Sequence, residues 1–388
     1  MDFSLSEEQD AIRAAITKIC TRFDAEYWLR KDREGGFPHD FHAAFVEAGW
    51  LGICIPEEHG GAGLGLTEAA VMMQAVAQSG AGLSGASALH MNIFGVNPVV
   101  VFGTPEQMQR MLPPLIAGAD KACFAVTEPD AGLDTLKLKT KAVRDGDRYI
   151  LSGQKIWIST AQVATKMLIL ARTTPLEEMT KPTLGLSLFY TELDRRHVQV
   201  REIDKMGRKA IDSNELFIDG LPVPAADRIG EEGRGFEYIL HGMNAERVLI
   251  AAEAIGLGRA ALARAVAYAK ERVVFGRPIG KNQAIQHPLA VAWMELEAAN
   301  LMVFKAASLY DRKLPCGAEA NAGKYLAAEA AFKACQTAVM THGGMGYAKE
   351  FHVERYLREA MIPRLAPVSP QMILCFIAEK VLGLPKSY

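Results

Sequence analysis

The sequence lacks the features that mark several common classes of protein. Its 388 residues include 43 Lys and Arg against 45 Asp and Glu, so there is no basic excess. Proteins that bind nucleic acids through phosphate contacts usually carry such an excess, and we therefore expect no nucleic-acid partner. Disordered proteins combine few apolar residues with a large net charge. With 49% hydrophobic residues and a formal charge of −2, this chain is predicted to fold.

Motifs for metals, disulfides and targeting are also missing. The six cysteines lie far apart and include no C-x-x-C pair, so the sequence indicates neither a metal site nor a disulfide framework. Such cysteine usage is typical of a reducing compartment. The N-terminal residues, MDFSLSEEQ, are acidic and lack the apolar core of a signal peptide. We therefore predict a cytoplasmic protein.

Long uncharged runs are limited to one segment. Residues 69–105 contain no Asp, Glu, Lys or Arg, as would a membrane-spanning helix of about 20 residues. Glycine, serine, asparagine and proline residues interrupt this segment at many positions, however. We interpret it as buried helices and turns of a large protein and expect no membrane association.

The spacing of apolar residues divides the chain into three parts. Helix-spaced apolar residues follow a capping-box pattern at Ser4 and Glu7 and continue to about residue 120. Short β-type runs come next, with Asp-Gly turn signals at residues 145–146 and 219–220. Long segments rich in helix formers then predict a helical bundle. We predict an α+β protein with a helical domain, an antiparallel β domain and a helical domain at residues 1–120, 121–234 and 235–388.

Several clusters have two interpretations when each is taken alone. EPDAG at residues 128–132 is either a turn that ends a strand or a loop whose glycine admits a cofactor. Trp157 is either core or an aromatic wall beside a flat ring. Arg272 is either part of a basic helix C-terminus or a bidentate phosphate ligand. GGMG at residues 343–346 allows close backbone contact. Glu246 is either an N-terminal-turn glutamate, in a helix that starts after Gly242, or a functional carboxylate.

In their order along the chain, six such motifs resemble the acyl-CoA dehydrogenase family of flavoproteins, and the resemblance covers essentially the whole chain. It implies a helical N-terminal domain, a middle β domain and a C-terminal four-helix bundle. It also implies FAD bound between the last two domains, and a homotetramer built as a dimer of dimers. The motifs are TEPDAG at residues 127–132, GQKIWIS at 153–159, GEEGRGF at 230–236, ERVVFGRPI at 271–279, GGMGY at 343–347 and VERYLR at 353–358.

For the cofactor, the resemblance implies two groups of residues. The first group lies against FAD within the same subunit, with hydrogen bonds from Thr127 and Ser159. Its members are Phe124, Val126, Thr127, Gly132, Trp157 and Ser159. The second group meets the FAD of the neighbouring subunit, which would link cofactor binding to dimer formation. Its members are Arg272, Phe275, Gln283, Gly343 and Gly344.

The family reaction is the α,β-dehydrogenation of an acyl-CoA thioester to the trans-2-enoyl-CoA. A carboxylate removes the α-proton while the β-hydrogen leaves as hydride to flavin N5, and the electrons pass to an electron-transferring flavoprotein. Most members carry this base in a Tyr-Glu-Gly-Thr loop, where this chain has Pro367 in place of the glutamate. Isovaleryl-CoA and long-chain acyl-CoA dehydrogenases carry it on a helix before an arginine, as Glu246 and Arg247 stand here. The resemblance therefore implies Glu246 as the catalytic base, with Asn244 and Arg247 holding CoA or orienting the base.

Other departures from the family concern FAD and the acyl chain. Leu133 and Met340 stand where many members have serine and glutamine, so some FAD contacts are expected to differ. Pro367 has no N–H, which leaves an amide such as that of Val368 to polarise the thioester oxygen. Residues 81–103, expected to line the acyl end of the pocket, contain no Lys or Arg. We predict an apolar pocket and a role in fatty-acid or branched-acid catabolism.

Two alternatives stay open. A relative of the acyl-CoA oxidase type would pass electrons to oxygen, although such oxidases are often much longer than 388 residues. A flavin-bearing acyl-CoA-binding protein without catalysis would explain why Pro367 replaces the usual base.

Overall fold

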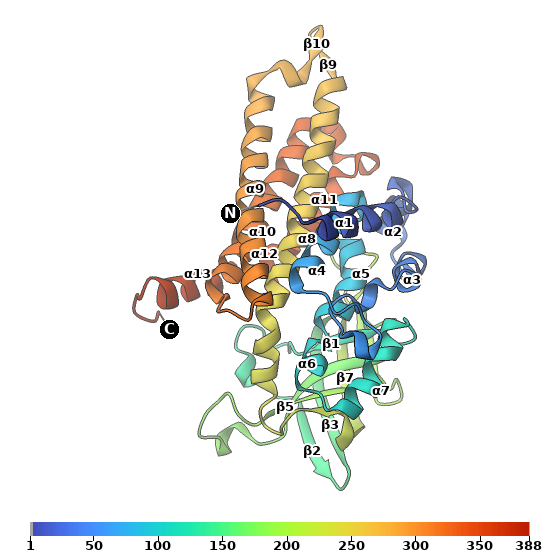
Figure 1. Cartoon of the computed structure of the whole chain (residues 1–388), viewed down its shortest axis with the longest axis vertical. Helices are drawn as coiled ribbons and strands as arrows, with labels where there is room; N and C mark the ends of the chain where they lie inside the picture. The colour runs from blue at the N-terminus through green and yellow to red at the C-terminus, as the bar shows by residue number, and fades with distance from the viewer. Residues whose placement is uncertain (1–2, 388) are drawn as a thin grey trace.

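The N-terminal part of the chain is helical. The computed structural model describes residues 3–387, and Figure 1 shows the N-terminal helices beside the long C-terminal helices, with the β sheet at one end of the molecule. The first helix begins with a capping box formed by Ser6 and Gln9. The prediction from Ser4 and Glu7 was therefore two residues early. The helices are α1 (Glu7–Cys20), α2 (Ala25–Glu34), α3 (His39–Glu47), α4 (Leu66–Val76), α5 (Gly82–Phe94), α6 (Asn97–Phe102) and α7 (Pro105–Ile116).

The uncharged segment at residues 69–105 forms most of α4, all of α5 and α6, and the start of α7. A π-type turn at Ala77–Ala81 separates α4 from α5, and Gly80 lies outside helical geometry there with a φ of 106°. The run Leu66–Phe102 is long and apolar enough to cross a membrane, but 72% of its most apolar window is buried inside the structure. It therefore packs as core, as the interruptions in its sequence predicted.

The middle of the chain forms a mixed sheet. Its strand order is β6-β7-β3-β2-β4-β5-β8, with β1 beside β4. Most neighbouring strands are antiparallel, as predicted, whereas β1 and β2 run parallel to β4. The strands are β1 (Ala122–Ala125), β2 (Lys141–Asp145), β3 (Arg148–Ser159), β4 (Lys166–Arg172), β5 (Leu186–Glu192), β6 (Val198–Glu202), β7 (Ser213–Pro224) and β8 (Arg228–Ile229).

The two Asp-Gly signals have different outcomes. Residues 145–146 turn the chain from β2 into β3, and Gly146 has a φ of 61°, so this prediction is confirmed. The turn predicted at residues 219–220 is wrong, because both residues lie inside β7. They oppose the single residue Ser152 where the register of β3 shifts, and Gly220 has a φ of 63°. The Asp-Gly pair thus forms a β-bulge, which needs the same backbone freedom as a hairpin turn.

The C-terminal part is a helical bundle. Three long helices pack together, and the shorter α11 packs against two of them, α8 and α10. The strands β9 (Val273–Val274) and β10 (Arg277–Pro278) form a hairpin between α8 and α9, at the opposite end of the molecule from the large sheet (Figure 1). The predicted three-part fold is confirmed. The helices are α8 (Gly235–Glu271), α9 (Gln283–Asp311), α10 (Gly317–His342), α11 (Val353–Glu359), α12 (Ile362–Leu365) and α13 (Pro370–Phe376).

The hydrophobic core explains how α5 is placed. One apolar cluster joins the N-terminal helices to α8, α9 and α10, while two smaller clusters cover the two faces of the sheet. Successive side chains of β4 point to opposite faces of the sheet. Leu168 therefore belongs to one of these clusters and Ile169 to the other. Helix α5 contacts both α8 and β1. It therefore lies at the junction between the bundle and the sheet.

Candidate active site

Glu246 lies inside α8, about three turns from its start. The helix begins at Gly235 rather than after Gly242, so the interpretation of Glu246 as an N-terminal-turn glutamate is wrong. The field of a helix dipole falls off within the first turn and does not account for a glutamate at this depth. The Glu246 side chain is 12% exposed. A buried carboxylate in the middle of a helix needs a partner of its own.

That partner is His90 on α5. Nε2 of His90 donates to Oε2 of Glu246, and Nδ1 donates to Oε1 of Glu253, two turns further along α8. Both His90 and Glu253 are buried. The second oxygen of Glu246, Oε1, accepts no hydrogen bond from residues 3–387. One oxygen of the carboxylate is thus anchored, and the other is available to a ligand.

The two carboxylates keep His90 charged. Burial by itself would lower the pKa of His90, but the facing charges of Glu246 and Glu253 and their hydrogen bonds raise that pKa well above its ordinary value of 6.5. We did not predict His90 or Glu253 from the sequence. The signal that was available is the spacing of Glu246 and Glu253, which places two acidic residues on one face of a largely apolar helix.

Helix α5 also connects Glu246 to the β sheet. The ring of Phe94, about one turn beyond His90, has its centroid 5.8 Å from that of His90. On its other side the ring of Phe94 lies 5.3 Å from that of Phe124 in β1. Phe124 was predicted to contact the flavin. Two ring contacts therefore join the predicted cofactor face to the partner of Glu246.

Trp157 and Ser159 lie at the end of β3, where the register against β7 shifts. Trp157 has a φ of 62° and is 56% exposed, so its interpretation as core is wrong. Oγ of Ser159 accepts a hydrogen bond of 3.0 Å from Nη2 of Arg208, and Nη1 of Arg208 donates to Oγ of Ser87 on α5 at 3.0 Å. Residues 81–103 contain no Lys or Arg, but Arg208 brings a guanidinium to them from the β part. No local pattern predicts this contact, because Arg208 is 121 positions from Ser87.

The motif at residues 127–132 is a strand-ending turn, as one of its two interpretations proposed. The backbone amide of Ala131 donates to the carbonyl of Glu128 at 3.1 Å. The carboxylate of Glu128 lies 3.0 Å from Nζ of Lys155 and accepts from the backbone amide of Thr140 at 2.9 Å. The carboxylate of Glu128 is therefore used within the protein.

The predicted cofactor residues of this segment differ in their exposure. Val126 is buried, and its carbonyl accepts from Lys155 at 3.0 Å. Thr127 is half-buried, and its carbonyl accepts from the backbone amide of Ile156 at 3.0 Å. A Cβ atom added to Gly132 would meet nothing within 4 Å. The structure thus leaves Gly132 and the Thr127 hydroxyl open to an external group.

The second predicted cofactor group lies far from the first within one chain. Arg272, Phe275, Gly343 and Gly344 line one cavity of about 870 Å³, and Gln283 is exposed at the start of α9 nearby. This cavity is at the hairpin end of α8, whose 37 residues span about 55 Å. The large sheet is at the other end (Figure 1). The structure therefore does not bring the two groups together in one subunit.

Arg247 and Lys324 supply positive charge beside Glu246. Nη1 of Arg247 donates to Oδ1 of Asn244 at 3.0 Å, while its buried Nε has no partner within residues 3–387. Burial lowers the pKa of Arg247. Lys324 on α10 donates to the carbonyl of Val368 at 2.6 Å, and burial together with Arg247 lowers the pKa of Lys324 to about 8. The contact between Lys324 and Val368 holds the loop that contains Pro367 against α10.

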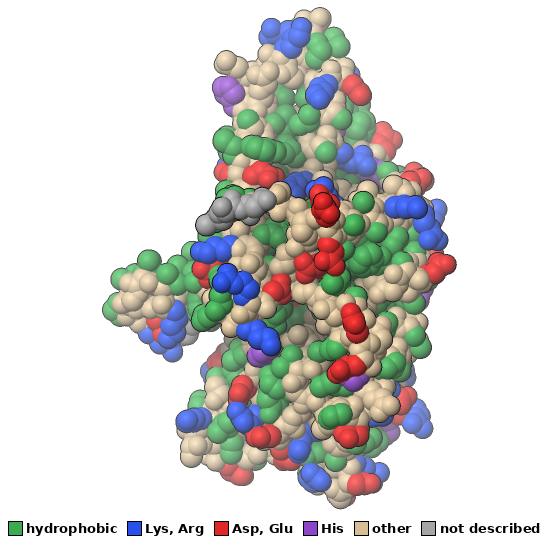
Figure 2. All heavy atoms as spheres, viewed as in Figure 1, with side chains coloured by type: hydrophobic (Ala, Val, Ile, Leu, Met, Phe, Trp, Pro, Cys, Tyr) green, Lys and Arg blue, Asp and Glu red, His purple; other side chains and the backbone are tan. Residues whose placement is uncertain are grey.

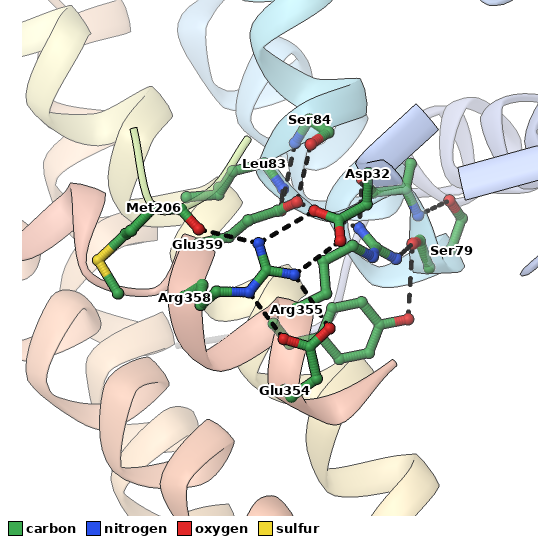
Figure 3. A network of polar contacts seen from close by, with 12 residues as sticks. Asp32, Ser79, Leu83, Ser84, Met206, Glu354, Arg355, Arg358 and Glu359 are labelled. Atoms are coloured by element: carbon green, nitrogen blue, oxygen red, sulfur yellow. Dashed lines mark hydrogen bonds and ion pairs between the residues drawn. The ribbon is translucent and has the colours of Figure 1, made fainter. Parts of the chain in front are cut away.

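A buried polar network fixes the start of α5 (Figure 3). Glu359 on α11 accepts from the backbone amides of Leu83 and Ser84 at 2.7 and 3.3 Å, and from Oγ of Ser84 at 2.7 Å. Arg355 donates to the same carboxylate at 3.2 Å. These groups satisfy backbone donors that the helix leaves free at its N-terminus. They hold the helix that carries His90 about two turns later.

Comparison with known families matches nearly the whole chain. The N-terminal domain of acyl-CoA dehydrogenase matches residues 6–119, the middle domain residues 123–221 and the C-terminal domain residues 233–381. The chain is 38% identical to "Acyl-CoA dehydrogenase fadE12" of Mycobacterium bovis, over 100% of this chain and 99% of that protein. It is 35% identical to "Caffeyl-CoA reductase-Etf complex subunit CarC" of Acetobacterium woodii, over 85% of this chain and 86% of that protein.

Solved structures agree with these matches. Butyryl-CoA dehydrogenase from Megasphaera elsdenii superposes with a TM-score of 0.93 at 30% identity, over 98% of this chain and 100% of that one. The prolyl acyl carrier protein oxidase AnaB gives 0.91 at 30% identity, also over 98% and 100%. The FAD complex of PigA gives 0.92 at 26% identity, over 99% and 100%.

Proposed function

Because the chain belongs to the acyl-CoA dehydrogenase family of FAD-dependent oxidoreductases, we propose that it converts an acyl-CoA thioester to the trans-2-enoyl-CoA with Glu246 as the base. The observation that carries this proposal is the carboxylate of Glu246, which is buried, anchored through one oxygen and free at the other. It lies where the bundle, α5 and the sheet meet. Pro367, at the position of the usual base, has no group that can accept a proton.

The residues on the β side fit a flavin. Trp157 presents an exposed ring from a left-handed backbone conformation, which a bulky residue adopts only where its surroundings impose it. Together with the half-buried Phe124 it would form an apolar wall, and the hydroxyls of Thr127 and Ser159 would donate hydrogen bonds. When bound, FAD would accept the β-hydrogen with its electron pair.

The chain's own groups would carry the proton chemistry. Oε1 of Glu246 would form the bond to the α-proton as the α C–H bond breaks. The thioester oxygen gains negative charge in this step and needs fixed donors. The backbone amide of Val368 remains our candidate donor to the thioester oxygen. Pro367 has no N–H, and the Val368 amide makes no hydrogen bond within residues 3–387. Arg247, whose Nε is unpartnered, and Asn244 would hold the CoA moiety or orient Glu246.

We further propose that the second cofactor group acts on the FAD of a partner subunit in a homotetramer. Within one chain that group is too distant from Trp157 to share a ligand with it. Phe275 is fully exposed at the hairpin tip. Helix α9 also exposes Trp293, Met294 and Leu301, and Figure 2 shows hydrophobic side chains at the surface in this part of the molecule. Exposed apolar surface of this kind is typical of a subunit interface.

The electron acceptor in this proposal is an electron-transferring flavoprotein. A relative named as a subunit of a caffeyl-CoA reductase–Etf complex supports this choice. Oxygen is the second candidate, because the chain also resembles an acyl carrier protein oxidase over that protein's whole length. Chain length therefore does not separate dehydrogenases from oxidases, contrary to what we expected from the sequence.

Two further parts of the proposal concern organisation and location. We propose domains at residues 1–120, 121–234 and 235–388. The changes from α7 to β1, between Ile116 and Ala122, and from β8 to α8, at Gly235, support these boundaries. We also propose a cytoplasmic location, which the six free cysteines support.

A panel of substrates tests the proposed function. Purified holoenzyme would be mixed anaerobically with straight-chain, branched and aryl-substituted acyl-CoA thioesters, and flavin absorbance would be followed. We expect at least one thioester to bleach the flavin. A flavin that stays oxidised with every thioester, yet shows spectral signs of binding, would favour the binding-protein alternative. Rapid peroxide formation in air without an added acceptor would favour the oxidase.

A further inference from the structure

We propose that His90 and Glu253 are positioning residues for this reaction. His90 would hold one oxygen of Glu246 so that the other faces the substrate, and Glu253 would hold the ring of His90. This inference rests on the proposed role of Glu246 as the base. It assigns a function to two buried groups that the family resemblance did not include.

The geometry leaves the His90 ring only one orientation. Both of its nitrogens donate to carboxylates, so a flip of the ring would break two hydrogen bonds at once in a buried site. Glu246 and Glu253 come from one rigid helix, while His90 comes from α5. The carboxylate of Glu246 is therefore fixed from a second element. A base displaced by about 1 Å can lose roughly 100-fold in rate, so a fixed carboxylate matters for catalysis.

Positively charged side chains surround the cluster of His90, Glu246 and Glu253. An imidazolium between two carboxylates leaves one negative charge, and buried charges are tolerated when they are paired. Arg208 interacts with Glu253, while Arg247 and Lys324 interact with Glu246. Oε2 of Glu253 and Nε of Arg208 have no hydrogen-bond partner within residues 3–387. The ionisable groups that face His90 itself are Glu246 and Glu253.

The hydrogen bond from His90 to Glu246 persists through the proposed step. As the α C–H bond breaks, a new O–H bond forms at Oε1 of Glu246, and both N–H bonds of His90 remain in place. The imidazolium then faces one charged carboxylate instead of two. Because Glu253 still faces Nδ1, the ring keeps its orientation and Nε2 keeps its donor bond to Oε2 of Glu246.

Two amide variants separate positioning from simple packing. In His90→Gln the side-chain amide nitrogen can reach the place of Nε2 and still donate to Glu246. In His90→Asn the amide nitrogen lies nearer the place of Nδ1, so the contact with Glu253 can persist while that with Glu246 is lost. His42→Gln is the matched control, because His42 is also buried but contacts Asn92 and lies outside the site.

The first experiment measures anaerobic flavin reduction in the holoenzyme with the best thioester of the panel. We expect His90→Asn to lower the limiting rate about 100-fold and His90→Gln about 10-fold, with the substrate concentration at half-maximal rate nearly unchanged. His42→Gln should match wild type. Equal losses in both His90 variants, or wild-type rates in both, would overturn the proposal. Bound-flavin spectra and melting temperatures confirm that each variant is folded.

The second experiment does not depend on turnover. Solid-state nitrogen NMR of histidine-labelled holoenzyme reports the charge of each ring, and the signals missing from His90→Gln identify His90. We expect a charged ring at pH 7.5 in wild type and a neutral one in Glu253→Gln, which would also shift the pH profile of flavin reduction. A neutral His90 in wild type would overturn the proposal. If the ring is charged but no thioester reduces the flavin, the proposed function fails instead.

Discussion

Nζ of Lys155 lies 3.0 Å from Oε1 of Glu128, and both side chains are buried beneath the turn that follows β1. Lys155 also donates to the carbonyls of Val126 and Leu170 at 3.0 and 2.8 Å. The two residues belong to different motifs, TEPDAG and GQKIWIS, that carried the family resemblance. Their pairing locks the two segments together. Next to this pair, the carbonyl of Thr127 accepts from the backbone amide of Ile156, the residue before Trp157.

Loss of this pair should destabilise the β part of the protein. Glu128→Gln would leave the ammonium group of Lys155 buried without its charge partner, which typically costs about 3–5 kcal/mol. Thermal melting should therefore show a clear drop in Tm. Asp130→Asn is the control, because Asp130 in the same turn pairs with Lys139 at an exposed position. Its loss should leave the Tm unchanged. A smaller loss in the double variant Glu128→Leu/Lys155→Met would show that the unpaired charge causes the effect.

Removal of the proposed base should stop flavin reduction without removing the flavin. Glu246→Gln keeps the size of the side chain and can still accept a hydrogen bond from His90, but it cannot take the α-proton. We expect flavin reduction to fall by at least about 1,000-fold, within the range attributed to general bases. Stopped-flow absorbance under anaerobic conditions measures this rate. Glu237→Gln, at an exposed position of the same helix that pairs with Arg234, should reduce at the wild-type rate. Near-normal turnover of Glu246→Gln would place the base elsewhere.

Composition and periodicity were enough to predict the order of helical, β and helical parts. Long runs of helix formers and short strands bounded by turn residues leave clear local patterns. The missed details are those that local pattern does not determine. The Asp-Gly pair at residues 219–220 suits both a hairpin turn and a bulge, and only the pairing of β7 with β3 decides between them.

The candidate site was predictable only where a motif marked it. Glu246 was identified through its position before Arg247, and the resemblance supplied its role. His90 lies 156 positions earlier, in a segment whose lack of charge indicated core. His90 is buried, as the sequence predicted for this segment, but its partners are supplied by α8, which packs beside α5. Arg208 was missed for the same reason, since its contact with Ser87 joins segments that are distant in sequence.

A side chain at Gly344 should weaken FAD binding without harming the subunit. A Cβ added there meets nothing within 4 Å in this chain, so any clash would be with a bound group or a partner subunit. If Gly344 contacts FAD, Gly344→Val should cost about 1–3 kcal/mol of binding, a roughly 5- to 150-fold loss of affinity. Flavin content after dialysis measures this. Gly346→Val is the contrast, because its Cβ would lie 2.2 Å from the carbonyl oxygen of Val339 and should destabilise the subunit itself. Full FAD retention in Gly344→Val would contradict the assignment.

The start of α5 should tolerate no side chain at Gly82. Gly82 has a φ of 63°, and a Cβ there would lie 2.5 Å from Oε2 of Glu359. Gly82→Ala should therefore lower the Tm and slow flavin reduction, because α5 carries His90. Gly36→Ala is matched for backbone strain, since Gly36 has a φ of 80° and nothing lies within 4 Å of its Cβ position. The control should lose only the backbone cost of about 1–2 kcal/mol and keep its reduction rate. Equal effects of the two variants would mean that the contact with Glu359 is unimportant.

The contribution of His90 to stability should be largest at mildly acidic pH. Burial alone would lower its pKa, but Glu246 and Glu253 raise it well above 6.5, so the folded protein binds this proton more tightly than the unfolded chain. The stabilisation is complete below about pH 6.5 and is lost as the pH rises through the raised pKa. The Tm difference between wild type and His90→Gln should therefore be larger at pH 6 than at pH 10. His42 has the opposite sign, because burial lowers its pKa to about 4, and the difference for His42→Gln should grow from pH 4 to 6.5 and then stay level. Differential scanning calorimetry at these pH values checks both trends, and a His90 difference that grows with pH would show that its ring is not charged in the folded protein.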